Sequence, residues 1–173
     1  MKTRKKKQHI LRRYLSESIG HEKQVELFEA IDEFAIKYPN GKVALFINSP
    51  GGIAECAFAI RDYIEACPLQ INTVVQGEVG SAAVIVFLVG KERFMSKSSV
   101  IVFHRPWKKT DSLLFAEDAR WIANDLDRIE NGMLELICEK TGKDREAVKN
   151  DLNRFRIFSA QEALEYGLVH RII

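Results

Sequence analysis

The sequence predicts a layered α/β fold built on a mainly parallel sheet. Two observations carry this prediction: short apolar runs typical of buried strands alternate with segments of helical periodicity, and turns containing glycine or proline separate the two. Such alternation is typical of right-handed strand–helix–strand crossovers. A chain of 173 residues is long enough for one domain with a sizeable core.

The first half of the chain supplies the clearest strands and helices. Residues 13–19 are expected to form a short strand, and residues 21–36 a helix, because their apolar side chains recur every three or four positions. Residues 42–48 are apolar on both faces, as in a strand covered by helices. The turn SPGG then leads into a helix over 53–66, and residues 71–76 form the next buried strand.

The second half begins with an apolar helix over 81–90, and strands are expected at 93–96 and 99–104. Near the C-terminus, a short helix follows the TG dipeptide of the segment TGKDREAVKNDL. Another helix spans 159–167, where a serine is followed by glutamate three residues later in a capping box. The segment LVHRII closes the chain as a strand.

The longest predicted element is a helix over roughly 111–140. A helix of about 30 residues is ~45 Å long, which exceeds the diameter of a small domain. Its apolar positions step alternately by four and three residues, a spacing that suits packing against another helix. We therefore expect a contact with the same helix of a second subunit; the alternative is that the helix folds back over its own sheet. The apolar positions are Phe115, Ala119, Ile122, Leu126, Ile129, Met133 and Leu136.

Composition and charge narrow the classes of function. Hydrophobic residues make up 46% of the chain and charged residues 29%, as in an ordinary folded protein. A net charge of +2 gives no indication of a nucleic-acid or membrane partner. Six residues from Lys2 to Lys7 concentrate positive charge in an N-terminal arm, residues 1–12, that we expect to be flexible.

The sequence shows no recognisable targeting segment, and its cysteines lie in apolar contexts; both features predict a cytoplasmic protein. The longest apolar run, residues 82–90, is too short to span a bilayer, and no signal-peptide pattern follows the basic arm. The cysteines at positions 56, 67 and 138 lie in apolar contexts without metal-ligand spacing. We expect them to be reduced thiols of the core.

Candidate catalytic residues follow three predicted strands, in the segments NSPGG, GEVGS and FHRP. In α/β sheets, chemistry gathers beyond the carboxyl ends of the strands. Ser81, which opens a helix, is a candidate nucleophile, and His104 is a candidate base for its proton. The N–H groups of Gly52 and Ala82 are candidates for an oxyanion hole. Each signal is weak alone, since a serine at a helix start is normally a cap, but together they indicate acyl transfer.

The order of these motifs resembles a known family. FINSPGG, then Ser81, then VFHRP, then FSAQEALEYGLV resemble the proteolytic subunit of the Clp protease, a self-compartmentalising serine peptidase. The resemblance covers the chain from about Arg13 to its end. It implies the ClpP/crotonase-like fold, an α/β architecture in which a β-β-α unit repeats as a spiral and a long handle helix protrudes.

The resemblance also implies roles and partners. Ser81 matches the nucleophile, His104 the general base, and the amides of Gly52 and Ala82 the oxyanion hole, with no metal or organic cofactor. Heptameric rings would stack through the handle into a barrel that cuts polypeptides for protein quality control. A hexameric AAA+ unfoldase would supply the ATP hydrolysis, and the basic arm is expected to lie around the axial pore or to be disordered.

The third member of the catalytic triad departs from the family pattern. The position of the family's aspartate is taken by Phe155, and the nearest substitutes are Asn153, Asp151 or a backbone carbonyl. In trypsin, neutralising that aspartate lowers kcat on the order of 10⁴-fold. We therefore expect a Ser–His peptidase of reduced activity. The alternatives are a catalytically impaired structural or regulatory subunit of a Clp-type barrel and a crotonase-fold acyl-CoA enzyme.

Overall fold

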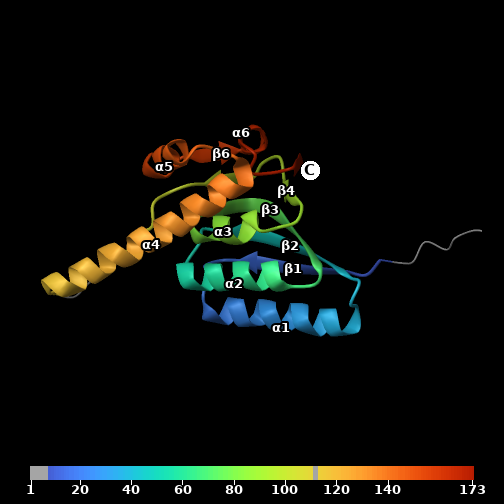
Figure 1. Ribbon diagram of the computed structural model, residues 1–173. Coiled ribbons are helices and arrows are strands. Elements are labelled where there is room, and N and C mark those ends of the chain that lie inside the picture. Colours follow the sequence, from blue (N-terminus) through green and yellow to red (C-terminus); the bar gives the residue numbers. More distant parts are fainter. Residues whose placement is uncertain (1–7, 111–112) are drawn as a thin grey trace, which may run out of the picture.

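A seven-stranded sheet forms the centre of the computed structural model, which describes residues 8–110 and 113–173 (Figure 1). The strands run in the order β1-β2-β3-β4-β7, with β5 beside β3 and β6 beside β5. The described pairings are parallel except that of β5 with β6, which is antiparallel. The predicted α/β class with a mainly parallel sheet is confirmed.

The three longest strands lie side by side along their length. They are β1 (Ile10–Ser16), β2 (Lys42–Ser49) and β3 (Gln70–Gly80). β1 begins three residues earlier than expected and takes in the end of the predicted arm, because its backbone finds partners along β2. Arg12 and Arg13 are exposed on this edge strand. The basic run from Lys2 to Lys7 lies outside the described residues.

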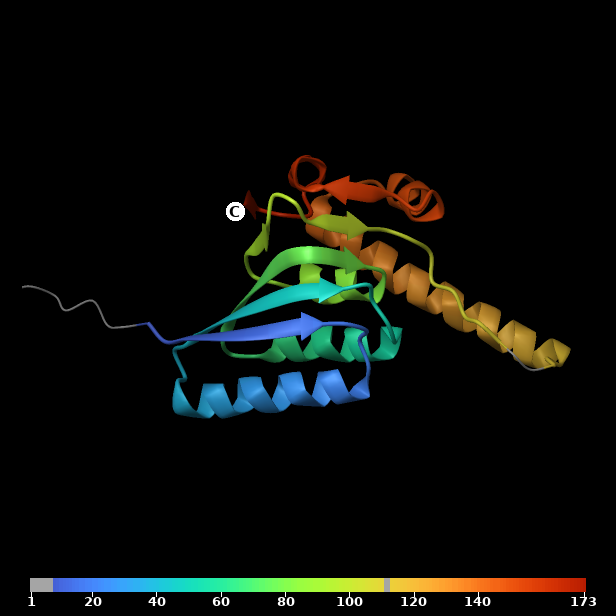
Figure 2. The same cartoon turned by 180° about the vertical axis from the view of Figure 1, so that it is seen from behind.

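Helices cover one face of the sheet, and Figures 1 and 2 show the two sides of this arrangement. The covering helices are α1 (His21–Lys37), α2 (Ala54–Ala66) and α3 (Ala82–Leu88), close to the bounds predicted for them. Every residue of α3 is buried, so this short helix is the centre of the core. No helix within 8–110 or 113–173 combines the length and the apolar character that crossing a membrane requires.

β3 pairs with different neighbours at its two ends. Its residues Thr73–Val75 pair with β4 (Arg93–Met95), and Glu78–Gly80 pair with β5 (Val100–Val102). The register with β2 shifts between these two stretches, which marks a bulge. β3 therefore continues four residues beyond its predicted end and delivers the next residue, Ser81, to the start of α3.

Gly77 makes this bulge possible. Its φ is 110°, a conformation that favours glycine, and a Cβ there would lie 2.3 Å from Asn48 Oδ1. The same Asn48 oxygen accepts the N–H of Glu78 at 3.0 Å, and Ser99 Oγ accepts the N–H of Gly77 at 2.9 Å. Two side chains thus satisfy backbone groups that the shifted register leaves without a strand partner.

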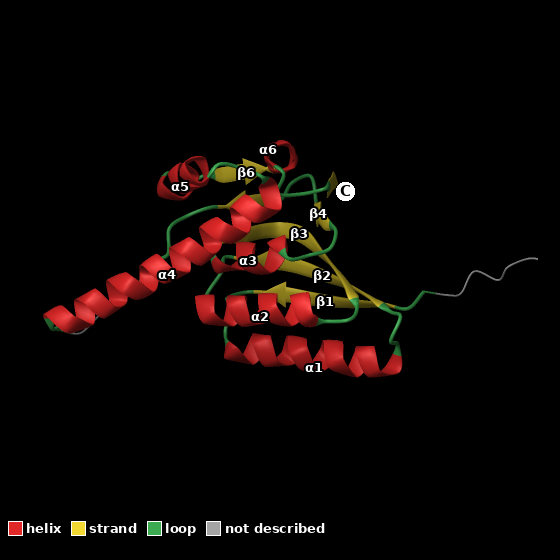
Figure 3. Cartoon of the chain, viewed as in Figure 1, coloured by secondary structure: helices red, strands yellow, loops and turns green. Residues whose placement is uncertain are grey.

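The C-terminal elements lie at the far edge of the sheet (Figure 3). They are α5 (Arg145–Asn153), β6 (Ile157–Ser159), α6 (Ala160–Tyr166) and β7 (Arg171–Ile172). The capping box is confirmed: Ser159 N–H donates to Glu162 Oε2 at 2.9 Å, and Glu162 N–H donates to Ser159 Oγ at 3.4 Å. β6 was not predicted, because its pairing with β5 depends on residues distant in sequence.

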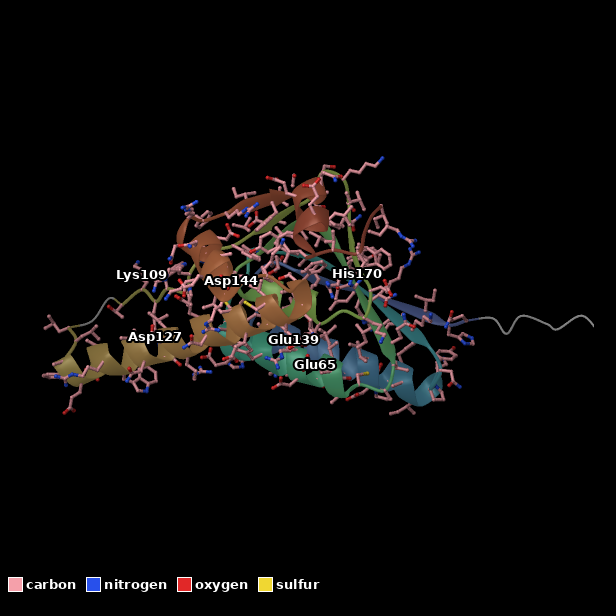
Figure 4. All side chains as sticks on the ribbon, turned by 45° about the horizontal axis from the view of Figure 1, so that its top comes forward. Glu65, Lys109, Asp127, Glu139, Asp144 and His170 are labelled. Carbon is pink, nitrogen blue, oxygen red and sulfur yellow. The ribbon has the colours of Figure 1, made fainter. Side chains whose placement is uncertain are left out.

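The handle is α4 (Ala116–Thr141), which projects from the body at its N-terminal end (Figures 1 and 4). It begins later than the predicted start at 111, and residues 111–112 lie outside the described part. The apolar stripe divides along the helix: Ile129, Met133 and Leu136 are buried, whereas Phe115 is exposed. The helix therefore packs on its own domain at one end, as the alternative expected, and leaves its other end uncovered.

Candidate active site

Ser81 is held in a strained backbone conformation between β3 and α3. Its φ of 51° and ψ of −127° are rare for a residue with a side chain and cost on the order of 1–3 kcal/mol. Its N–H donates to the carbonyl of Val102 at 3.2 Å. Its hydroxyl makes no capping hydrogen bond, and no hydrogen bond to any other described residue. The ordinary role of a helix cap therefore does not account for this serine, and a strained strand-to-helix turn is typical of a nucleophile.

The turn after β2 approaches Ser81 closely, and only glycine fits there. A Cβ on Gly51 would lie 2.6 Å from Ser81 Cβ, and one on Gly52 would lie 2.3 Å from the carbonyl oxygen of Ile19. Ile19 N–H donates to the Gly51 carbonyl at 2.7 Å, and Ile53 N–H donates to the Ile19 carbonyl at 2.9 Å. These two bonds fix the turn on either side of Gly52.

The amides of Gly52 and Ala82 donate to no acceptor among the residues that the structure describes. The Gly52 N–H donates none of the backbone hydrogen bonds formed outside helices and strands by the described residues. The Ala82 N–H belongs to the first turn of α3, where helices lack intrahelical acceptors. Both residues line the cavity that Ser81 also lines. Two free donors beside a hydroxyl are the components of an oxyanion hole.

His104 lines the same cavity, which has a volume of about 600 Å³. The structure therefore brings the four predicted site residues to one place. Apolar side chains of the handle form part of the wall: Leu126, Ile129 and Met133. These three residues belong to the apolar stripe predicted for the handle, but they were not expected at the site.

His104 Nδ1 lies 2.7 Å from the carbonyl oxygen of Arg105. A carbonyl only accepts hydrogen bonds, so this bond places a proton on Nδ1 and leaves Nε2 of the neutral imidazole as the atom that can accept one. The ring of Phe155 stacks on the imidazole, with centroids 5.4 Å apart and planes inclined by 13°. Phe155 itself has a φ of 54°.

Neither side chain considered for the third position is hydrogen-bonded to His104. Asp151 instead accepts two bonds from Arg156 Nη1, at 2.9 and 3.0 Å, and one from the Tyr166 hydroxyl at 2.8 Å. Burial, together with this bond to Asp151, raises the pKa of Tyr166. Asn153, exposed at the end of α5, makes no side-chain hydrogen bond with the described residues. Of the expected substitutes, the backbone carbonyl is the one hydrogen-bonded to the imidazole.

Charged side chains around the cavity are largely paired. Arg105 Nε donates to Glu130 Oε2 of the handle at 2.8 Å. At the rim, Arg128 Nη2 joins Asp125 at 2.8 Å and Glu55 at 3.2 Å. The Arg105–Glu130 pair was not predicted, because 25 residues separate its members and Glu130 lies in no motif that points to Arg105.

Comparison with known proteins relates most of the chain to one protein family. The family model described as Clp protease matches residues 6–173. ATP-dependent Clp protease proteolytic subunit 2 of Frankia casuarinae is 31% identical over 137 residues, which are 78% of this chain. The matched region spans only 62% of that relative's length. Proteolytic subunit 1 of Protochlamydia amoebophila is 29% identical over 162 residues, which are 92% of this chain and 79% of the relative.

Among solved structures, a ClpP1 mutant from Listeria monocytogenes has a similar fold. The TM-score is 0.84 at 24% sequence identity, and the match covers 94% of this chain and 90% of that one. The expected fold, with its long protruding helix, is confirmed by this similarity.

Proposed function

The chain belongs to the Clp protease family, and from that premise we propose that it is a serine peptidase subunit that cuts polypeptides. One observation carries the proposal: the hydroxyl of Ser81, the imidazole of His104 and the free amides of Gly52 and Ala82 line one cavity. The family assignment leaves the crotonase-type acyl-CoA alternative without support.

In the proposed reaction Ser81 Oγ attacks a peptide carbonyl while His104 Nε2 takes its proton. The N–H groups of Gly52 and Ala82 donate to the oxyanion that develops. The C–N bond then breaks, and the leaving amine receives the proton from His104. Water hydrolyses the acyl-enzyme with His104 again as the base. No metal or organic cofactor takes part in these steps, and the apolar wall of the handle suits an apolar substrate side chain.

The proposed activity is lower than that of an enzyme with a complete triad. A carbonyl oxygen orients the imidazole but does not carry the full negative charge with which a carboxylate stabilises the imidazolium. A second candidate function, a structural or regulatory subunit in a mixed barrel, is favoured by Phe155, which the resemblance aligns with that carboxylate and whose ring stacks on the imidazole.

Peptide hydrolysis by homogeneous protein tests the proposal. Short fluorogenic peptides with an apolar residue before the scissile bond should be cut, and Ser81→Ala should lower kcat by about 10³-fold or more. Ser98→Ala, in an exposed turn, is the matched control and should retain the activity. Wild-type protein without hydrolysis above the Ser81→Ala background would favour the structural role instead.

We propose further that the projecting half of the handle pairs two rings, heptameric as the resemblance implies. Apolar side chains at and just before the N-terminal end of α4 are strongly exposed in the single chain: Leu113 at 100%, Phe115 at 80% and Trp121 at 61%. Several large apolar side chains exposed on one projecting segment suit an interface with another subunit. We propose that an AAA+ unfoldase docks on the axial face of the ring. The free thiols of the three cysteines suit a reducing compartment such as the cytoplasm.

Sedimentation of variants tests the interface. Phe115→Glu combined with Trp121→Glu should release particles of about half the wild-type mass, because burying two unpaired carboxylates between helices is costly. Glu117→Gln, on the same exposed turn, should leave the mass unchanged. An unchanged mass in the double variant would rule out the handle as the ring–ring contact.

A further inference from the structure

We propose that Arg105 is a positioning residue whose carbonyl holds His104 and whose side chain anchors that carbonyl to the handle through Glu130. The inference rests on the proposed peptidase function. It assigns the orientation of His104, which a carboxylate provides in a complete triad, to the backbone carbonyl of Arg105. It joins three contacts of the described residues: His104 Nδ1 with Arg105 O, Arg105 Nε with Glu130 Oε2, and the Phe155 ring with the imidazole.

The contact between His104 Nδ1 and the Arg105 carbonyl determines which ring nitrogen carries the proton. With its proton on Nδ1 donated to the Arg105 carbonyl at 2.7 Å, the neutral imidazole presents an unprotonated Nε2. A general base needs that form, because the tautomer determines which nitrogen can accept the serine proton. Phe155, stacked at 5.4 Å and nearly parallel, limits rotation of the ring out of this plane.

A carbonyl from an irregular segment needs an anchor of its own. Residues 103–110, after β5, form no helix or strand, so no ladder of backbone hydrogen bonds fixes the Arg105 peptide. The guanidinium provides the anchor by donating to Glu130 Oε2 at 2.8 Å. Glu130 lies on α4, one residue after Ile129 of the cavity wall.

The burial of Glu130 makes this anchor firm. The Glu130 side chain is only 9% exposed, whereas the Arg105 side chain is 57% exposed and reaches inward to meet it. A buried carboxylate is strongly disfavoured without a cation, so the fold holds Arg105 in place to satisfy Glu130. Arg105 therefore links the position of α4 to the orientation of the His104 imidazole.

A pair of double variants tests the link without leaving an unpaired buried charge. Arg105→Met with Glu130→Leu removes the anchor, and the apolar leucine replaces the buried carboxylate without leaving an unpaired charge. We expect kcat to fall by about 10- to 100-fold, with KM changed by less than about twofold, as for loss of a residue that orients a catalytic group. Arg105→Glu with Glu130→Arg restores an ion pair in reverse and should recover most of the lost kcat.

A matched control applies the same apolar replacement to an exposed ion pair on α2. Arg61→Met with Glu65→Leu should leave kcat unchanged, since Arg61 Nε and Glu65 Oε2, 3.4 Å apart, lie away from the cavity lining. Wild-type kcat in the Arg105→Met, Glu130→Leu protein, or a loss that the reversed pair does not recover, would overturn the proposal. Melting temperature and particle mass confirm that each variant is folded.

A spectroscopic readout separates this inference from the proposed function. Nitrogen NMR of the histidine rings, with His104→Gln to assign the signal, should show the Nδ1–H tautomer at His104 in wild-type and Ser81→Ala protein alike. The Arg105→Met, Glu130→Leu protein should show a mixture of tautomers. An Nε2–H tautomer in the wild type would overturn the proposal even if the protein hydrolyses peptides, and the Nδ1–H form would support it even if hydrolysis is absent.

Discussion

Replacing Phe155 by aspartate is expected to raise kcat for peptide hydrolysis by about 10- to 10³-fold. The Phe155 ring already lies against the imidazole of His104, so a carboxylate at this position would be close to the same ring. Its negative charge would stabilise the imidazolium of His104 in the proposed attack by Ser81. The φ of 54° at position 155 also suits aspartate better than a bulky aromatic residue.

Two companion variants separate charge from shape at this position. Phe155→Asn has nearly the size of aspartate without its charge and should give a smaller gain. Phe155→Leu removes the aromatic stack without adding an acceptor and should lower kcat. Steady-state kinetics on the assembled protein measure kcat for the three Phe155 variants. If Phe155→Asp folds, assembles and remains as slow as the wild type, the missing carboxylate is not what limits the reaction.

Replacing Gly52 by alanine is expected to destabilise the protein by about 3 kcal/mol or more and to abolish hydrolysis. The added Cβ would lie 2.3 Å from the carbonyl oxygen and 2.6 Å from the nitrogen of Ile19, and these backbone atoms cannot move aside cheaply. The φ of 146° adds strain for any residue with a side chain. The turn would shift and carry one of the two proposed oxyanion donors away from the cavity.

Gly20→Ala is the matched control for this prediction. A Cβ on Gly20 meets nothing within 4 Å, and its φ of −147° is extended backbone that alanine adopts readily. Urea unfolding should therefore place Gly20→Ala near the wild type and Gly52→Ala well below it. Equal midpoints for the two variants would contradict the close packing of the turn against Ile19.

Local patterns in the sequence were sufficient for the helices and for expecting Gly52, Ser81, Ala82 and His104 near one another, and the four residues line one cavity. The helix expected at 21–36 is found at His21–Lys37, because three- and four-residue spacing of apolar side chains encodes a buried face directly. The segments that carry Ser81 and His104 follow strands, and adjacency of parallel strands brings their ends together.

Features that depend on distant partners were not predictable in this way. The apolar stripe of the handle could not reveal which half is covered by its own domain, since the same spacing serves both kinds of packing. The partner of His104 is the carbonyl of the next residue, Arg105. A backbone carbonyl was one of the three expected substitutes, but every residue carries one, so no side-chain pattern shows which carbonyl is used. Asp151 was a reasonable candidate by position, but Arg156 and Tyr166 occupy its oxygens.

Labelling of the assembled wild-type protein with a fluorophosphonate, followed by mass spectrometry of its peptides, tests most directly whether hydroxyl, imidazole and amides act on one reacting atom. A covalent adduct on Ser81 is predicted, slowed by about 10²-fold or more in His104→Ala and absent in Ser81→Ala. An unlabelled Ser81, beside a reference serine peptidase that labels under the same conditions, would contradict the proposed catalytic site.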